Sequence, residues 1–109
     1  PSTVIIVGTP SWSQDVDVVA LDKLAYPNLM YALHFYTHKE FLRTKANKAL
    51  ALDLPIFVTE FGTTSPDNLT GPFLDQMEVW NAWMFDNKIS WANWTFSDKN
   101  ELSAALKPG

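Results

Sequence analysis

The sequence predicts an α/β fold, half of a TIM (β/α)8 barrel made of four parallel strands and the helices between them. Strand-like apolar segments alternate with amphipathic helical segments, which is the order of a parallel sheet with right-handed crossovers. Polar or aromatic side chains lie at the ends of several predicted strands. In barrels, side chains at the carboxyl ends of different strands come together to form the active site. A complete barrel needs about 250 residues. The chain has 109 residues and is expected to be one domain, residues 1–109.

The first predicted strand is the apolar run at residues 4–7, which Gly8, Thr9 and Pro10 end. A long irregular connection is expected next, interrupted by Pro27. Residues 29–36 are the second predicted strand. Because residues two apart in a strand point to the same side, His34 and Tyr36 are expected to face one pocket.

Residues 39–52 show the apolar spacing of an amphipathic helix. Residues 55–60 form the third predicted strand, β-branched and aromatic without alternation, as expected of a strand that is covered on both faces. A second helix is predicted over 71–87 and a fourth strand over 89–96. The helix is expected to pack its large apolar side chains on the sheet, namely Phe73, Met77, Trp80, Trp83 and Met84.

Composition excludes several classes of function. The net charge of −4 gives no electrostatic footprint for nucleic acid, and the bases Lys39, Arg43, Lys45 and Lys48 are expected to form a solvated helix face. Cysteine is absent, and two histidines with no further cluster predict neither a metal site nor a cofactor. The sequence has no apolar run of about 20 residues, so no membrane span is predicted, and no signal segment is visible.

Glu60 is the most informative residue, because it places a carboxylate where a buried parallel strand should stop. Gly62 then marks the turn into a polar loop. Barrel enzymes present catalytic groups at this position. An acid that only caps the next loop is the alternative, and the position alone favours neither interpretation.

The aromatic content of 14% has two explanations. Most of these rings are expected in the core, but Trp12 in a polar loop and Trp94 near a strand end are the candidates for sugar-stacking positions. An open nucleotide-binding sheet is the competing fold. It is disfavoured because no glycine-rich phosphate loop follows any predicted strand.

Three segments together carry a family resemblance: Ala32-Leu33-His34-Phe35-Tyr36, residues 54–62 (LPIFVTEFG), and residues 89–94 (ISWANW) followed by Ser97-Asp98-Lys99. In this order and spacing, the chain resembles the later strands of glycoside hydrolase family 5 cellulases, the bacterial endo-β-1,4-glucanases. The resemblance covers essentially the whole chain. It implies that residues 4–7, 29–36, 56–60 and 89–94 are strands five to eight of the barrel.

The resemblance also implies roles for individual residues. Glu60 matches the nucleophile of a retaining mechanism. His34 and Tyr36 match a pair that lines the catalytic centre, and Tyr36 is expected to hydrogen-bond the nucleophile and keep it ionised. Trp94 resembles the platform for the sugar at the cleavage site, and Trp12 a loop aromatic of the cleft.

Lys99 and Glu101 fall where the family has sugar-binding polar groups, with plain surface charges as the alternative. A retaining glycosidase mechanism requires a second carboxyl group about 5–5.5 Å from the nucleophile. In the family this acid/base follows an asparagine at the end of strand four, and no matching pair precedes residue 4. The isolated chain is therefore expected to have little or no cellulase activity.

The expected partner is β-1,4-glucan or a cello-oligosaccharide, and the resemblance implies a secreted, extracellular protein. A half-barrel would leave two strand edges unpaired, which predicts a homodimer or larger homo-oligomer, or association with an N-terminal half-barrel. Three interpretations stay open. The chain is a fragment of a cellulase, a non-catalytic half-barrel that binds β-glucan, or a half-barrel that only self-assembles.

Overall fold

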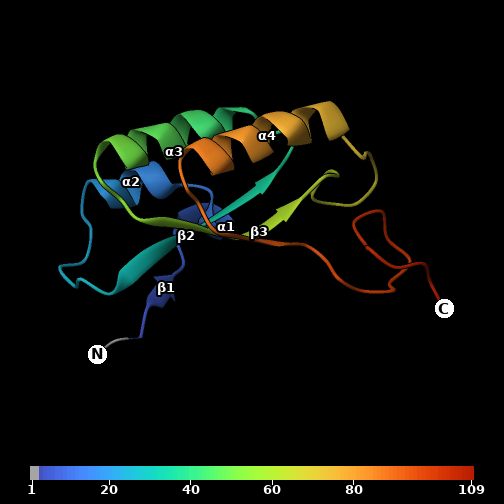
Figure 1. Ribbon diagram of the computed structural model, residues 1–109, viewed down its shortest axis with the longest axis horizontal. Coiled ribbons are helices and arrows are strands. Elements are labelled where there is room, and N and C mark those ends of the chain that lie inside the picture. The colour runs from blue at the N-terminus through green and yellow to red at the C-terminus, as the bar shows by residue number, and fades with distance from the viewer. Residues whose placement is uncertain (1–2) are drawn as a thin grey trace.

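A parallel four-stranded sheet is the centre of the structure, a computed structural model that describes residues 3–109 (Figure 1). The strands are β1 (Ile5–Val7), β2 (Leu29–Tyr36), β3 (Ile56–Gly62) and β4 (Trp91–Asn93). They pair in the order β1-β2-β3-β4, and each pair is parallel. Because every strand pairs with the next one along the chain, the strand order never reverses as it does in a doubly wound nucleotide-binding sheet.

The three longer helices lie on one face of this sheet and leave the other face uncovered. Figure 1 shows α2 (Val16–Ala20), α3 (Phe41–Ala51) and α4 (Leu74–Asp86) on the same side of the strands. The core lies between these layers, and Leu33, Phe35, Leu42, Val58 and Trp80 are all at most 1% exposed there. Side chains on the opposite face of β2 and β3 are therefore free to build a site.

Trp80 ties α4 to the sheet. Its ring stacks on Phe35 with centroids 3.7 Å apart, and its indole N–H donates to the carbonyl of Thr37 at 3.1 Å. The predicted packing face of this helix is confirmed at Met77, Trp80 and Met84, which are buried. Phe73 and Trp83, the other predicted members, are only partly buried.

Several predicted boundaries were wrong. The connection from residue 8 to 28 is not wholly irregular, because it contains α1 (Pro10–Ser13) and α2. α1 is a single left-handed turn and α2 has five residues, so neither is long enough for a helical period to be read from the sequence. α3 begins at Phe41 rather than 39, and α4 begins at Leu74 rather than 71, where Gly71 has a φ of 123° that no helix accepts. β4 spans three residues instead of eight.

A β-bulge in β3 decides which way Glu60 points. Leu33 pairs with Val58, but His34 pairs with Glu60, so Thr59 has no partner across the ladder. Ile56 and Val58 are buried under the helices, and strict alternation would place residue 60 there as well. The extra residue reverses the phase. As a result Phe61 is in the core and Glu60 is on the open face.

Candidate active site

A cavity of about 570 Å³ lies beside the carboxyl ends of β2 and β3. Its lining includes the predicted residues Glu60, His34, Tyr36 and Trp12. The structure thus brings together four of the seven predicted site residues, from two strands and from α1. The expectation that His34 and Tyr36 face one pocket is confirmed.

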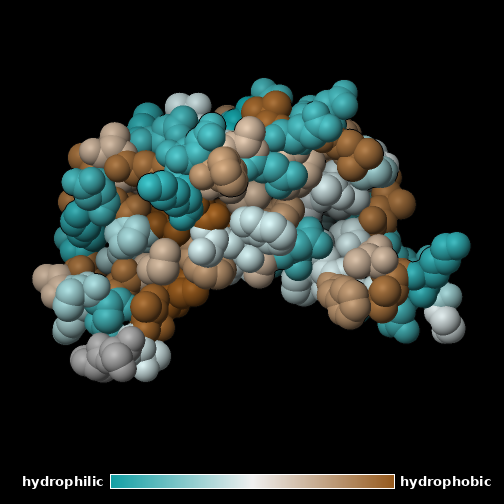
Figure 2. Space-filling model, in the orientation of Figure 1, coloured by the Kyte–Doolittle hydropathy of each residue, from teal (hydrophilic) through white to brown (hydrophobic). Residues whose placement is uncertain are grey.

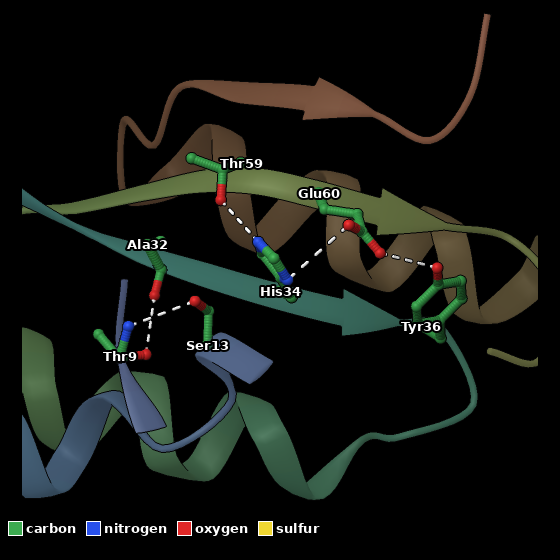
Figure 3. A network of polar contacts seen from close by, with 7 residues as sticks. All are labelled: Thr9, Ser13, Ala32, His34, Tyr36, Thr59 and Glu60. Carbon is green, nitrogen blue, oxygen red and sulfur yellow. Dashed lines mark hydrogen bonds and ion pairs between the residues drawn. The ribbon is translucent and has the colours of Figure 1, made fainter. Parts of the chain in front are cut away.

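Glu60 is held between two side chains of β2 (Figure 3). The hydroxyl of Tyr36 donates a hydrogen bond to Oε1 of Glu60 at 2.9 Å. On the other oxygen, Nδ1 of His34 lies 3.9 Å from Oε2, and both of these side chains are 27% exposed. The carboxylate is therefore accessible from the cavity while its orientation is fixed by neighbours.

Tyr36 acts as a permanent donor to this carboxylate. Burial of the phenol raises its pKa well above the ordinary value, and the hydrogen bond to Glu60 raises the pKa further. Gly62 makes room for the ring, because a Cβ at this position would lie 2.7 Å from Cε1 of Tyr36. Gly62 pairs with Tyr36 across the ladder, so the close approach follows from the strand register.

His34 has a second polar neighbour that the sequence did not reveal. Oγ1 of Thr59, the bulge residue, lies 2.8 Å from Nε2 of His34 (Figure 3). The imidazole therefore stands between the hydroxyl of Thr59 and the carboxylate of Glu60.

Trp12 projects from a left-handed turn and is 86% exposed. Ser11, Trp12 and Ser13 have φ values of 57°, 54° and 60°, a region that is strained for residues other than glycine. Asp15 anchors this turn through Lys45 of α3 and through the hydroxyl of Ser11. The hydrogen bond from Lys45, followed by that from Ser11, lowers the pKa of Asp15.

Thr9 fastens the start of the same turn to the sheet. Its hydroxyl donates to the carbonyl of Ala32 at 3.0 Å, and its backbone N–H donates to Oγ of Ser13 at 3.3 Å (Figure 3). The turn that carries Trp12 is thereby attached to β2, the strand that carries His34.

Trp94, Lys99 and Glu101 do not line this cavity. Trp94 lies just after β4, is 40% exposed, and its backbone N–H donates to the carbonyl of Phe61 at 2.8 Å. The negative charge of Glu101 contributes to the raised pKa of Tyr36. Lys99 is exposed.

The predicted solvated face of four bases was wrong for three of them, and only Lys48 is exposed. Lys39 precedes α3, lines the cavity and donates to Oε1 of Gln14 at 3.4 Å. Arg43 lies over the ring of Trp80, 4.9 Å from its centroid, and Lys45 pairs with Asp15. Helical periodicity could not reveal these contacts, because their partners come from distant parts of the chain.

Glu60 is the one acid that lines the cavity among residues 3–109. Within the same part of the chain, no group of three or more His, Cys, Asp or Glu residues is arranged to hold a metal ion. The described helices are also too short or too polar to cross a membrane.

The structure belongs to the barrel-type (β/α) class: its parallel strands pair in sequence order, and an acid, its hydrogen-bonding tyrosine and a tryptophan lie around one cavity at the strand ends, where barrels carry their sites. The family model "Cellulase (glycosyl hydrolase family 5)" matches residues 1–100. The chain belongs to this family, and the resemblance seen in the sequence is confirmed.

Curated relatives agree with this assignment. An endoglucanase of Clostridium saccharobutylicum is 50% identical over the whole chain, and endoglucanase A of Evansella cellulosilytica is 47% identical. The chain spans 25% and 23% of the lengths of these two proteins.

Solved structures show the same fold. Cellulase Cel5C_n is 55% identical with a TM-score of 0.93, and the match covers 97% of this chain and 33% of that one. The catalytic domain of Thermobifida fusca endoglucanase Cel5A is 33% identical with a TM-score of 0.92, and the match covers 100% of this chain and 38% of that one. The predicted fold class, a parallel sheet that forms part of a barrel, is thereby confirmed.

Proposed function

We propose that Glu60 is the nucleophile of a retaining endo-β-1,4-glucanase, and that residues 1–109 form the C-terminal half of its catalytic barrel, with β1 to β4 as strands five to eight. The observation that carries this proposal is the position of Glu60 at the cavity: Tyr36 donates a hydrogen bond to one carboxylate oxygen and His34 lies beside the other. The chain that holds this arrangement belongs to the family 5 cellulases. This geometry suits a carboxylate that must stay ionised and aimed at one carbon atom.

In the retaining reaction, a carboxylate oxygen of Glu60 attacks the anomeric carbon while a second carboxyl group protonates the leaving oxygen. Water then hydrolyses the covalent glycosyl-enzyme, and the second group acts as the base. The lining of the cavity offers no other acid within residues 3–109. We therefore infer that the acid/base comes from outside this segment and that the isolated chain has little or no activity.

The inferred substrate is β-1,4-glucan or a cello-oligosaccharide. Trp12 at the cavity and Trp94 after β4 are partly or largely exposed rings of the kind that stack on sugar faces. Lys99 and Glu101 are the inferred polar contacts beyond Trp94. A variant of the Thermobifida fusca enzyme has been solved in complex with cellotetraose, which supports this substrate class. Membership of the family 5 cellulases supports a secreted, extracellular protein.

The test uses the complete polypeptide that carries these residues and an activated aryl cellobioside. Glu60→Gln is expected to abolish turnover, whereas the control Glu40→Gln, at an exposed position before α3, should leave it unchanged. A 2-fluoro cellobioside should label the peptide that contains Glu60, as mass spectrometry would show. Full turnover by Glu60→Gln, or labelling of another residue, contradicts the proposal.

A second experiment addresses the missing acid/base. Residues 1–109 are mixed with a separately produced N-terminal half of the same polypeptide and assayed on carboxymethylcellulose. Cleavage by the mixture, with none by either half, is the expected result. Glu60-dependent turnover by residues 1–109 alone would show that a second carboxyl already lies in this segment.

Association through the sheet edges is a second candidate function, and the exposure of β1 favours it. Val4, Ile5 and Ile6 are 56%, 52% and 40% exposed, and Figure 2 shows apolar surface over β1. At the opposite edge Trp91 is 54% exposed. A second copy, or the N-terminal half-barrel, would pair with these edges and bury this surface. Binding of cello-oligosaccharide without hydrolysis would instead support a glucan-binding half-barrel.

A further inference from the structure

We propose that Thr59 is a positioning residue that donates a hydrogen bond to Nε2 of His34 and so holds the imidazole in the tautomer whose Nδ1–H faces Glu60. The proposal rests on the inferred role of Glu60 as the nucleophile. Thr59 does not itself line the cavity, and its contact there is with His34, through which it acts.

The β-bulge is what makes this contact possible. Thr59 has no partner across the ladder, because Val58 and Glu60 pair with the consecutive residues Leu33 and His34. In a regular strand, neighbouring side chains point to opposite faces. Here the hydroxyl of Thr59 and the carboxylate of Glu60 approach the same imidazole, from two consecutive positions of β3 (Figure 3).

Electrostatics selects the direction of the hydrogen bond. A neutral imidazole carries one N–H, and the hydroxyl of Thr59 can either donate or accept. If Nε2 carried the proton, the lone pair of Nδ1 would face the negative Oε2 of Glu60, 3.9 Å away. If Thr59 donates to Nε2, the proton sits on Nδ1 and the N–H dipole points toward Oε2. The second arrangement is the attractive one.

The side chain of Thr59 is suited to this task. Its β-branched carbon restricts χ1, so the hydroxyl stays aimed at Nε2, which is 2.8 Å away. With the Nδ1–H tautomer in place, each oxygen of Glu60 faces a donor: Tyr36 on Oε1 and His34 on Oε2. The plane of the carboxylate is then fixed relative to the cavity, which is what attack on a single carbon atom requires.

The test reads the tautomer directly. The complete polypeptide is labelled with ring-¹⁵N histidine and studied in alkaline solution, at a pH where the ¹⁵N shifts themselves show a neutral ring. The ¹⁵N shifts identify which ring nitrogen carries the proton, and the signals of His34 are assigned with His34→Asn. Wild type and Thr59→Ser should show the proton on Nδ1. Thr59→Val, which has the same shape without the hydroxyl, should move it toward Nε2.

Turnover provides the second readout. Thr59→Val should lower kcat roughly five- to tenfold with little change in KM, and Thr59→Ser should stay within about twofold of wild type, as for the loss and retention of one hydrogen bond. The signals of His38, an exposed residue outside the contact, should be the same in all variants.

A wild-type proton on Nε2, or identical His34 spectra for Thr59→Val and Thr59→Ser, would overturn the inference. If Thr59→Val does not fold, the tautomer of wild type and of Thr59→Ser still decides it. Failure of the proposed function is a separate result. It would appear as full turnover by Glu60→Gln, whatever the tautomer of His34.

Discussion

The protonation state of Tyr36 is set by its burial and by one hydrogen bond, the one to Glu60. Burial and the hydrogen bond to Glu60 both raise its pKa, so the phenol keeps its proton beyond the pH at which an exposed tyrosine ionises. By linkage, this contact contributes fully to stability below the ordinary pKa of about 10 and is lost only as the pH rises through the raised pKa. Across the neutral range Tyr36 is therefore a hydrogen-bond donor.

Removing this donor should impair catalysis more than folding. In the complete polypeptide, Tyr36→Phe is expected to lower kcat/KM on cello-oligosaccharides roughly 10- to 100-fold, the effect of losing one hydrogen bond to a charged group. Tyr26→Phe is the matched control, because Tyr26 is 67% exposed. A Tyr36→Phe enzyme with the activity of wild type would show that the bond to Glu60 does not orient the nucleophile.

Gly62 should matter for the same reason as Tyr36. A methyl group at this position would lie 2.7 Å from the ring of Tyr36, so Gly62→Ala must displace the phenol from Glu60. We expect kcat/KM to fall about as far as in Tyr36→Phe, and the double variant to lose little more, since both changes remove one contact. Gly8→Ala is the control, with its nearest atom 3.8 Å away. Additive losses in the double variant would separate Gly62 from Tyr36.

At the scale of elements, the ion pair between Asp15 and Lys45 joins the turn that carries Trp12 to α3. The pKa of Asp15 is lowered on folding, so its contribution to stability is present above the ordinary value of 3.8 and is lost as the pH falls through the lowered value. Asp15→Asn should therefore reduce the free energy of unfolding at neutral pH, by at most about 1 kcal/mol for so accessible a pair.

Urea unfolding of Asp15→Asn and wild type, at neutral pH and in acid, measures this effect. The difference between them should vanish in acid, where the carboxyl of Asp15 is protonated in both states. A difference that does not change with pH would assign the effect to the amide itself and not to the charge.

Trp80 is the side chain on which the packing of α4 depends. Trp80→Phe should lower the free energy of unfolding by about 1–3 kcal/mol, because it leaves a cavity beside Phe35 and an unpaired carbonyl at Thr37. Trp83→Phe is the control, since Trp83 is only partly buried and donates to the exposed Asn47. Equal losses in the two variants would contradict this account.

Long periodic elements were predictable from the sequence, and short irregular ones were not. β2, α3 and β3 lie close to their predicted positions, because each is long enough to show its pattern. The core positions of Met77, Trp80 and Met84 followed from helical spacing in the same way. α1 and α2 were missed because they span only four and five residues.

The site was predictable as a set of residues but not as a geometry. Glu60, His34 and Tyr36 were named from their places at strand ends, yet simple alternation would put Glu60 beside the buried Val58. No single residue in the sequence signals the bulge at Thr59, because a bulge is a property of the pairing with β2. The contact of Thr59 with His34 was missed for this reason, as was the place of Lys39 at the cavity.

At the scale of the whole molecule, the sheet formed by the described residues has two edge strands, and α2, α3 and α4 all lie on one of its faces (Figure 1). In a closed barrel, each of these edges would be paired and the open face would be filled by side chains from the other strands. The chain covers 33% and 38% of two solved cellulases to which it is similar. The apolar side chains at β1 are those that such closure would cover.

Produced alone, residues 1–109 should therefore associate. Two copies related by a two-fold axis can pair β4 of one with β1 of the other and close a ring of parallel strands, which buries the exposed Ile5 and Ile6. Sedimentation velocity at micromolar concentration should detect dimers or larger species whose fraction rises with concentration. Ile5→Lys should shift this equilibrium toward monomer, because a charge at a strand edge opposes pairing.

The matched control for that experiment is Val79→Lys. Val79 is as exposed as Ile5, at 51% against 52%, but it lies on α4 and not in an edge strand. If the edges drive association, only Ile5→Lys should dissociate the complex, and adding the N-terminal half should compete with it. A wild-type chain that stays monomeric throughout this concentration range would rule out edge pairing. Equal dissociation by both variants would move the interface to the helical side.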